Sequence, residues 1–246
     1  MATLINRGPS LTEKVRQHIK QLIVDGGFTE GRIPPETELA TDLGVSRTTV
    51  RDALSRLEHE GAVVRRQGAG TFVNQAGLRI KTRLEEMWSY EDMLRDHGFE
   101  PSVRVIDLVT GPAAADTAEV LGLEPGDDVV AMEKVFYEDD EPVVLTYNFV
   151  PAALVDGKAD KKDAEVPIFE FLEQQTGTQL AYYVSEIVPV LLTDEWAELL
   201  GAEPGSAAIS FDETGFSTDG QPLVHARSMF RDDLLRLGVM RRRAGG

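Results

Sequence analysis

An internal repeat restricts how the second part of this 246-residue chain can fold. Residues 121–150 read LGLEPGDDVVAMEKVFYEDDEPVVLTYNFV, and residues 200–230 read LGAEPGSAAISFDETGFSTDGQPLVHARSMF. Both copies begin with L-G-x-E-P-G and continue with a strand-like run, a turn, a proline and a second strand-like run. They align at a constant offset until the turn, where the second copy gains one residue. Each copy therefore predicts a pair of strands joined by a turn.

Helical and extended patterns surround the two copies. AADTAEVLG and TDEWAELLG precede them and are typical of short helices, the second capped by Thr193. Between the copies, VPIFEFLEQQTG indicates another helix and LAYYVSEIVPVLL a long strand. Because strands dominate and helices interrupt them, we expect an α+β domain built on an antiparallel sheet.

The first part of the chain shows a helical pattern. Ser10 and Glu13 form a capping box in front of an amphipathic run. A double proline at 34–35 precedes a short helical segment over 36–43. Ser46 then caps a third helix, whose core stripe consists of Val50, Ala53, Leu54 and Leu57.

A β-hairpin follows the third helix. The runs 63–66 and 71–73 are rich in apolar and β-branched residues, and a glycine-rich turn separates them. A helix, a short helix, a tight turn, a third helix and a hairpin together predict an N-terminal winged helix-turn-helix domain. In such folds the N-terminal residues of one helix enter the major groove of DNA.

The third helix carries the side chains that this mode of binding needs. Arg47 and Arg51 lie one turn apart and point the same way, so both can reach base edges. Hydroxyls and free N–H groups at the helix start can hold phosphate oxygens. The hairpin brings further donors towards the flanking backbone or the minor groove. These phosphate and hairpin residues are Ser46, Thr48, Thr49, Arg65, Arg66 and Gln67.

Charge is divided unevenly along the chain. The formal net charge is −17, yet residues 1–76 hold ten basic and nine acidic side chains. The acidity therefore belongs to the second part. Since the Debye length is about 8 Å at physiological salt, acidic groups in another domain are screened from a DNA surface. The alternative is that the arginine and threonine cluster is only a solvated helix face, which is the commoner meaning of such a cluster in an arbitrary sequence.

Composition argues against several classes of protein. The chain has no cysteine, which excludes disulfides, thiolate metal sites and a cysteine nucleophile. Its four histidines show no metal-ligand spacing, and His225 in a predicted strand is typical of a structural residue. No apolar run approaches the roughly 18 residues of a membrane span, and the N-terminus lacks an apolar signal core. We expect a soluble, cytoplasmic protein with no cofactor, no bound metal and no membrane contact.

Residues 10–74 resemble the DNA-binding domain of the GntR family of bacterial transcription regulators. The matching stretches are PPETELA, GVSRTTVRDALSRLEHEG and RRQGAGTFV. One departure is Thr37, which stands where the family usually has an arginine. The resemblance implies that DNA is contacted by Ser46, Arg47, Thr48, Thr49, Arg51, Gln67 and Gly68.

Residues 86–237 resemble the effector-binding, or UTRA, domain of the HutC subfamily, whose fold is similar to that of chorismate lyase. The supporting stretches are WSYEDMLRDHGFEPS, the two LGxEPG segments, DGQPLVHARSMFR and the pair Arg231 and Asp233. The resemblance implies a small-molecule cavity whose occupancy changes the placement of two DNA-binding domains in a dimer. The expected division is a winged helix-turn-helix DNA-binding domain at 1–75, a linker at 76–88, and a UTRA-like effector-binding and dimerisation domain at 89–246.

Several positions that line the family's ligand site are substituted here. The substitutions are Lys134 and Phe136 for two arginines, Thr146 for a glutamate, Pro167 and Phe169 for a serine and a tyrosine, and Val224 and Phe230 for a later glutamate and tyrosine. Because this removes a bidentate clamp for phosphate, we expect an apolar ligand, which could bear one carboxylate, in place of a sugar phosphate. Its counter-charge would be Lys134, or Arg227 turned inward. The alternative for each position is an ordinary core residue. The expected effector-binding residues are Ser89, Tyr90, Lys134, Phe136, Thr146, Phe169, Val224, Arg227 and Phe230.

These features together predict a homodimeric transcriptional regulator, a repressor that leaves a palindromic double-stranded DNA operator when a small-molecule effector binds. Two alternatives stay open. One is a DNA-binding protein that needs no ligand. The other is a lyase-like enzyme on the C-terminal fold, for which the sequence offers neither a Ser/His/Asp constellation nor a phosphate-cradling glycine loop.

Overall fold

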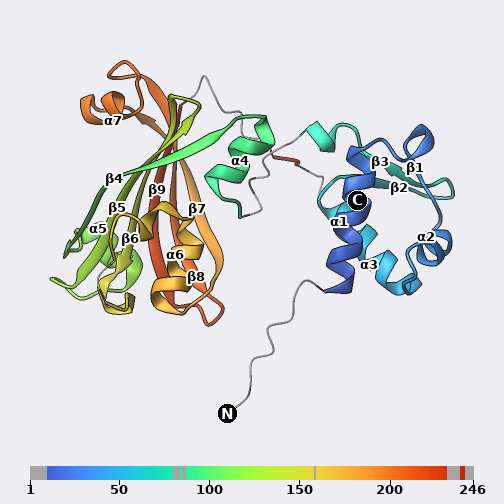
Figure 1. Ribbon diagram of the computed structural model, residues 1–246, viewed down its shortest axis with the longest axis horizontal. Coiled ribbons are helices and arrows are strands. Elements are labelled where there is room, and N and C mark those ends of the chain that lie inside the picture. Colours follow the sequence, from blue (N-terminus) through green and yellow to red (C-terminus); the bar gives the residue numbers. More distant parts are fainter. Residues whose placement is uncertain (1–9, 80–83, 85–86, 158, 232–238, 242–246) are drawn as a thin grey trace, which may run out of the picture. The chain divides into compact units, whose positions relative to one another are not determined.

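A computed structural model describes residues 10–79, 84, 87–157, 159–231 and 239–241. It divides into two compact units, residues 1–81 with 238–246 and residues 82–237 (Figure 1). The predicted division gave 238–246 to the second domain. The difference has a physical basis in Met240, whose methyl group lies beside Gly77 in the first unit. Part of the predicted linker 76–88, and Asp233, lie outside the described residues.

The first unit is the predicted winged helix-turn-helix. Three helices pack around one apolar core, and a small antiparallel sheet in the order β1-β3-β2 lies beside them. The first strand of this sheet was not predicted, because it spans two residues and forms only by pairing with β3. The elements are α1 (Leu11–Val24), β1 (Arg32–Ile33), α2 (Glu36–Asp42), α3 (Arg47–His59), β2 (Val63–Arg66) and β3 (Gly70–Val73).

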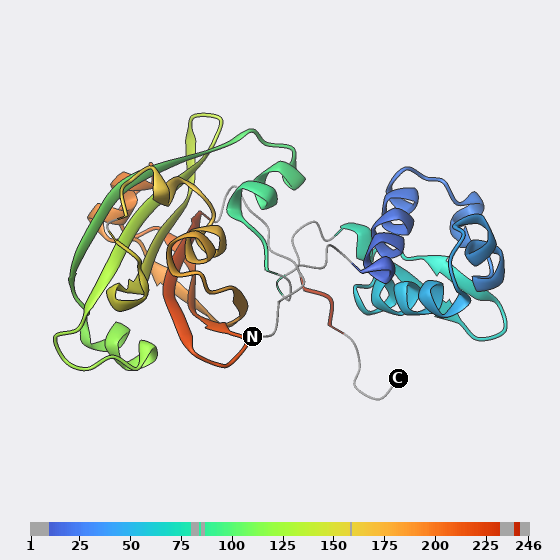
Figure 2. The ribbon, with the colours of Figure 1, turned by 60° about the horizontal axis from the view of Figure 1, so that its bottom comes forward.

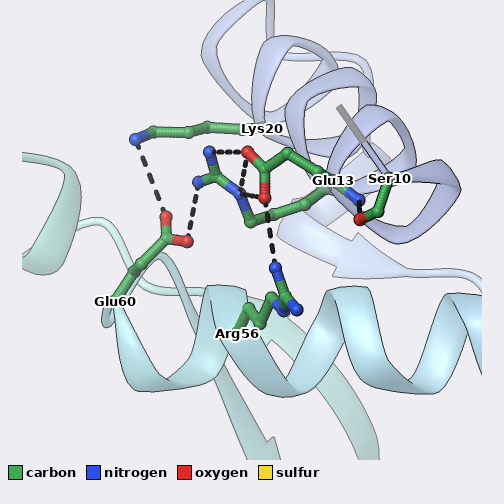
Figure 3. A network of polar contacts seen from close by, with 6 residues as sticks. Ser10, Glu13, Lys20, Arg56 and Glu60 are labelled. Carbon is green, nitrogen blue, oxygen red and sulfur yellow. Dashed lines mark hydrogen bonds and ion pairs between the residues drawn. The ribbon is translucent and has the colours of Figure 1, made fainter. Parts of the chain in front are cut away.

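Polar contacts join α1 to the end of α3 (Figure 3). Arg16 donates from Nε to Glu13 at 2.9 Å and from Nη1 to Glu60 at 2.7 Å. Arg56 of α3 also donates to Glu13, at 3.3 Å. Only half of the predicted capping box forms: Ser10 Oγ accepts from the Glu13 N–H at 3.2 Å, while the Glu13 carboxylate turns to the two arginines. The network adds polar contacts to the apolar packing of α1 against α3.

The second unit contains a single antiparallel sheet, seen from another side in Figure 2. It has six strands in the order β4-β5-β6-β9-β8-β7, which are labelled in Figure 1. The two copies of the sequence repeat form the hairpins β5–β6 and β8–β9, and their inner strands β6 and β9 pair at the centre of the sheet. The strands are β4 (Pro101–Pro112), β5 (Asp128–Glu138), β6 (Glu141–Pro151), β7 (Leu180–Leu191), β8 (Ala207–Ser217) and β9 (Pro222–Arg231).

The repeat is longer than the sequence pattern indicated. Each half of the unit runs helix, strand, helix, hairpin: α4-β4-α5-β5-β6 and then α6-β7-α7-β8-β9. The helices are α4 (Tyr90–His97), α5 (Ala115–Leu121), α6 (Ile168–Thr176) and α7 (Asp194–Leu199). Short 3-10 turns lie at Thr29–Gly31, Gly77–Arg79, Ala152–Leu154 and Asp163–Glu165.

Equivalent helices cover the same face of the sheet. Buried residues of α4 and α6 pack with even-numbered residues of β5 and β9, such as Phe136 and Ala226. Buried residues of α7 pack with odd-numbered residues, such as Val135 and Met229, and α5 approaches the same face through Thr117. We call these the α4/α6 face and the α5/α7 face. Within the described part of the chain, no helix is long and apolar enough to cross a membrane.

Candidate DNA-binding surface and effector cavity

The start of α3 is built as a polar, open helix end. Ser46 caps the helix by accepting the Thr49 N–H at 3.1 Å, and the two hydroxyls lie 2.8 Å apart. Because the first N–H groups of a helix have no partner within it, those of Arg47 and Thr48 are available to an anion. Ser46, Arg47 and Thr48 are exposed, whereas Val50 and Leu54 on the other side are buried in the core. One face of α3 is therefore packed against the core, and the opposite face, which we call the free face, is exposed.

Arg47 and Arg51 lie together on the free face, as predicted. Their side chains are 60% and 49% exposed, and both donate to the carboxylate of Glu36 at the start of α2, at 3.1 and 3.2 Å. Partial burial would raise the pKa of Glu36, but the hydrogen bonds from Arg51 and Arg47 outweigh it and lower that pKa. Glu36 was not predicted to take part. It holds two guanidinium groups in a geometry in which a guanine edge or a phosphate could replace it.

The predicted hairpin residues differ in their contacts with the rest of the first unit. Arg65 contacts α3, where it donates to Ser55 at 3.1 Å and pairs with Glu58 at 3.4 Å. The Arg66 guanidinium lies over the ring of Phe72, 4.7 Å from its centroid. Gln67 and Gly68 form the exposed turn, where the positive φ of Gly68, 73°, suits glycine.

Arg32 is a further basic residue at the hairpin. It is exposed on β1 and its guanidinium lies beside Gly70 of β3. Sequence reasoning missed it because nothing local reveals that residues 32 and 33 pair with the hairpin. Thr37, at the family's arginine position, is exposed on α2.

A cavity of about 690 Å³ lies on the α4/α6 face of the second unit. Its floor consists of two rows of paired residues that run across the sheet. One row is Lys134, Thr146, Ser228, Phe211 and Ile187; the other is Asn148, Ala226, Glu213 and Ser185. The start of α4 and the segment leading into α6 supply walls. Of the predicted residues, the cavity is lined by Ser89, Tyr90, Lys134, Phe136, Thr146 and Phe169.

Three predicted residues do not line the cavity. Val224 and Phe230 are buried core residues of the α4/α6 face, and the Phe230 ring packs 5.7 Å from that of Tyr90. Arg227 belongs to the α5/α7 face, because successive strand residues point to opposite sides. There it donates to Asp212 at 3.0 Å and pairs with Asp116 at 3.6 Å. From the sequence, Arg227 turned inward was one candidate counter-charge for the ligand, but in the structure its side chain points away from the cavity.

Aromatic and hydroxyl groups form one wall of the cavity. Ser89 caps α4 by accepting the Asp92 N–H at 3.0 Å, which places Tyr90 in the first turn. Tyr90 donates its hydroxyl to Ser228 at 2.6 Å, and its ring lies 4.9 Å from that of Phe136. Burial raises the pKa of Tyr90, so the phenol stays neutral. It can both donate and accept hydrogen bonds.

Lys134 lies at one end of the cavity floor and is 2% exposed. Its Nζ donates to the backbone carbonyls of Ala164 at 2.9 Å and Val166 at 3.0 Å. Burial lowers the pKa of Lys134 from 10.5 to about 8, against an opposing effect of the Glu91 carboxylate. The ammonium therefore stays largely protonated at neutral pH, with two of its three donors already used.

Two carboxylates of the cavity were missed from the sequence. Glu91 follows Tyr90 in α4, and burial raises its pKa. Its Oε2 is buried without a hydrogen-bond partner among the residues that the structure describes. Glu213 accepts a hydrogen bond from Ser185, and burial raises its pKa as well. Strand alternation in β8 could have found Glu213, since it shares a face with Phe211.

His225 belongs to a separate buried network. Its Nε2 lies 2.8 Å from Asp212 Oδ1 and its Nδ1 lies 3.0 Å from Thr117 Oγ1. Thr117 and His225 are each 2% exposed, and both lie on the α5/α7 face, away from the cavity. The network fastens α5 to the sheet. Within the described ranges, no group of three or more His, Asp or Glu side chains is placed to hold a metal ion.

Comparison with known families identifies both units. Residues 11–73 match the family "Bacterial regulatory proteins, gntR family", and residues 96–236 match the UTRA domain. The chain is 27% identical to the HTH-type transcriptional repressor NagR of Bacillus subtilis over 89% of this chain and 90% of that protein. It is 30% identical to a histidine utilization repressor of Pseudomonas putida over 86% and 80%.

Solved structures agree with these matches. The possible transcriptional regulator YydK of Bacillus subtilis superposes with a TM-score of 0.77, at 20% identity, over 94% of this chain and 99% of that one. PhnF of Mycobacterium smegmatis superposes with a TM-score of 0.59, at 26% identity, over 93% and 99%. With a GntR domain in front of a UTRA domain, and transcriptional repressors among its relatives, the chain belongs to the GntR family and is a ligand-responsive, DNA-binding transcriptional regulator.

Proposed function

We propose that the protein is a homodimeric repressor that binds a palindromic operator through α3 and the hairpin, and that a small molecule in the cavity releases it. The observation that carries this proposal is the exposed pair Arg47 and Arg51 beside the Ser46-capped helix start. Base contacts come from the two arginines, and phosphate contacts from Ser46, Thr48 and Thr49. Arg66, Gln67 and Gly68 contact the flanking DNA, with Arg65 and Arg32 supporting the hairpin.

The edge strand β7 supports the homodimer. It is the last strand of its sheet, so one side of its backbone has no neighbouring strand in that sheet. Large apolar side chains are exposed along it, among them Val184 at 58%, Val188 at 39% and Leu191 at 68%. A long, apolar, uncovered edge is a template for pairing with another chain. A second copy of this chain would cover it and give the two-fold symmetry that a palindromic operator requires.

The cavity favours a regulator with a ligand over a DNA-binding protein without one. A cavity volume of about 690 Å³ falls in the range of ordinary small-molecule sites, and polar groups converge on it. A lyase-like enzyme is the weaker alternative. The His225 network has no access to the cavity, since it lies on the other face of the sheet.

Footprinting and light scattering of the full chain test the proposal. We expect protection of two inverted half-sites about one helical turn apart and a dimer at micromolar concentration. A monomer bound to a single, non-palindromic site would refute the dimeric repressor. If a fraction of cell metabolites releases the operator and also raises the melting temperature of the protein, the result would support a small-molecule effector. Unchanged binding with every fraction would favour the ligand-independent alternative.

A further inference from the structure

The cavity carries an unequal charge at its two ends. Lys134 and Glu91 lie at one end, where each shifts the pKa of the other towards the charged form. Glu213 lies on β8, three strands away from Lys134 on β5. At ~4.8 Å per strand this separation is roughly 14 Å. Glu213 is therefore not neutralised by Lys134.

The groups around Glu213 do not neutralise it either. Its neighbours on the cavity floor are Ser185 of β7 and Ala226 of β9, to which it is paired across the sheet. Ser185 donates its hydroxyl, Tyr183 stays neutral because burial raises its pKa, and Asp212 adds a second negative charge nearby. A partly buried carboxylate without a counter-ion is costly, and a cationic partner removes that cost.

Lys134 is poorly placed to receive an anion. Two of its donors are used by the carbonyls of Ala164 and Val166, and Glu91 already supplies a negative charge. The other candidate cation, Arg227, lies on the opposite face of the sheet and is bonded to Asp212. Lys134 therefore keeps one donor, beside the Glu91 carboxylate, and Arg227 is outside the cavity, so a carboxylate or phosphate ligand would find at most a single cationic donor.

We propose that the effector of this cavity carries a cationic nitrogen, which binds the Glu213 carboxylate, joined to an apolar body that lies against Phe136, Phe211 and Ile187. The inference rests on the proposed effector-binding function and replaces the carboxylate ligand expected from the sequence. The amine and Glu213 form a charge-assisted hydrogen bond, with Ser185 as a second acceptor. Tyr183, which pairs with Gly215 next to the Glu213 position, also lines this part of the cavity.

Matched probes on the full chain test this assignment. The probes share a phenyl ring and differ in charge: 2-phenylethylamine, 2-phenylethanol and 3-phenylpropionate, each in the millimolar range. We expect the amine to raise the melting temperature most and the carboxylate least. In calorimetry, Glu213→Gln should weaken amine binding by about tenfold and leave binding of the alcohol unchanged. Glu119→Gln, an exposed residue of α5 with the same change in charge, is the control and should behave as wild type.

Each other outcome overturns the proposal in a distinguishable way. If the carboxylate probe bound more tightly than the amine, or if Glu213→Gln bound the amine as tightly as wild type does, the effector would not be a cation. The cavity would then still be an effector site, but of another specificity. No stabilisation by the amine would also overturn the proposal. If, in addition, no metabolite fraction released the operator, the effector function itself would fail. Operator binding by the untreated protein does not depend on any of these results.

Discussion

Replacing Arg51 by alanine should reduce sequence discrimination while leaving the fold intact. Arg51 is 49% exposed, and its ion pair with Glu36 is a surface pair, worth at most about 1 kcal/mol. Glu36 keeps its second partner, Arg47, at 3.1 Å. A bidentate arginine contact to guanine contributes ~1–3 kcal/mol of discrimination, so the ratio of operator to random-DNA affinity should fall roughly 5- to 150-fold. Arg47→Ala should have an effect of the same kind.

Arg56→Ala is the matched control for both variants. Arg56 lies on the same helix, is 55% exposed and also pairs with a glutamate, Glu13, at 3.3 Å. It points towards α1, however, so its loss should leave the affinity ratio unchanged. Thr49→Ala should weaken binding to operator and random DNA by similar factors, because a phosphate contact carries no sequence information.

Fluorescence anisotropy measures both affinities. Labelled operator and labelled random duplex are titrated at one fixed salt concentration, since phosphate contacts make every affinity depend on salt. Circular dichroism confirms that each variant is folded. If Arg47→Ala and Arg51→Ala both kept the wild-type ratio, α3 would not be the element that reads DNA.

Further predictions concern stability. Gly77→Ala should lower the free energy of unfolding in urea by about 2 kcal/mol or more, because the added Cβ would lie 2.0 Å from the Gly61 carbonyl oxygen. Gly111→Ala is the control and should lower it little, because no atom lies within 4 Å of its added Cβ. Equal losses of stability in the two variants would contradict this prediction. Because burial lowers the folded pKa of Lys134 to about 8, the unfolded state holds more protons between pH 8 and 10.5. Wild-type stability should rise across that window by on the order of 3 kcal/mol relative to Lys134→Met, whereas parallel pH profiles would argue against a buried ammonium. The Arg16 hydrogen bond lowers the pKa of Glu13, so Glu13→Gln should lose about 1 kcal/mol at neutral pH, and the loss should vanish in acid as the wild-type carboxyl takes up its proton.

Local signals in the sequence accounted for the elements of the fold. Ser46 and Thr193 cap the helices that they were predicted to cap, and the hairpin 63–73 forms where two short runs rich in apolar and β-branched residues flank a glycine-rich turn. The repeat predicted two hairpins because each copy of its pattern is about as long as one hairpin. The short helix in front of each copy was also predicted, and both helices end in A-E-x-L-G. The repetition of the earlier elements, α4-β4 and α6-β7, was not visible because their sequences are not alike.

The remaining features depend on contacts between distant residues. Glu36 meets Arg47 and Arg51 only when α2 and α3 pack together. Arg227 was expected to turn into the cavity, but the register of β9 with β8 places it opposite Asp212 on the other face. Glu213 lines the cavity because β6 and β9 pair at the centre of the sheet, which brings β8 alongside. The contacts of Glu36 have no local signal, whereas strand alternation places Glu213 on the face of Phe211 and Arg227 on the face opposite Val224 and Phe230.

Selection from a random DNA library tests the central claim, that the chain reads a DNA sequence through α3. The full wild-type chain and the Arg47→Ala/Arg51→Ala double variant are carried through the same rounds of binding and sequencing. We expect the wild type to enrich an inverted repeat and the double variant to enrich none, although it still binds DNA weakly at low salt. Enrichment of the same motif by both proteins, or of none by the wild type, would contradict the account.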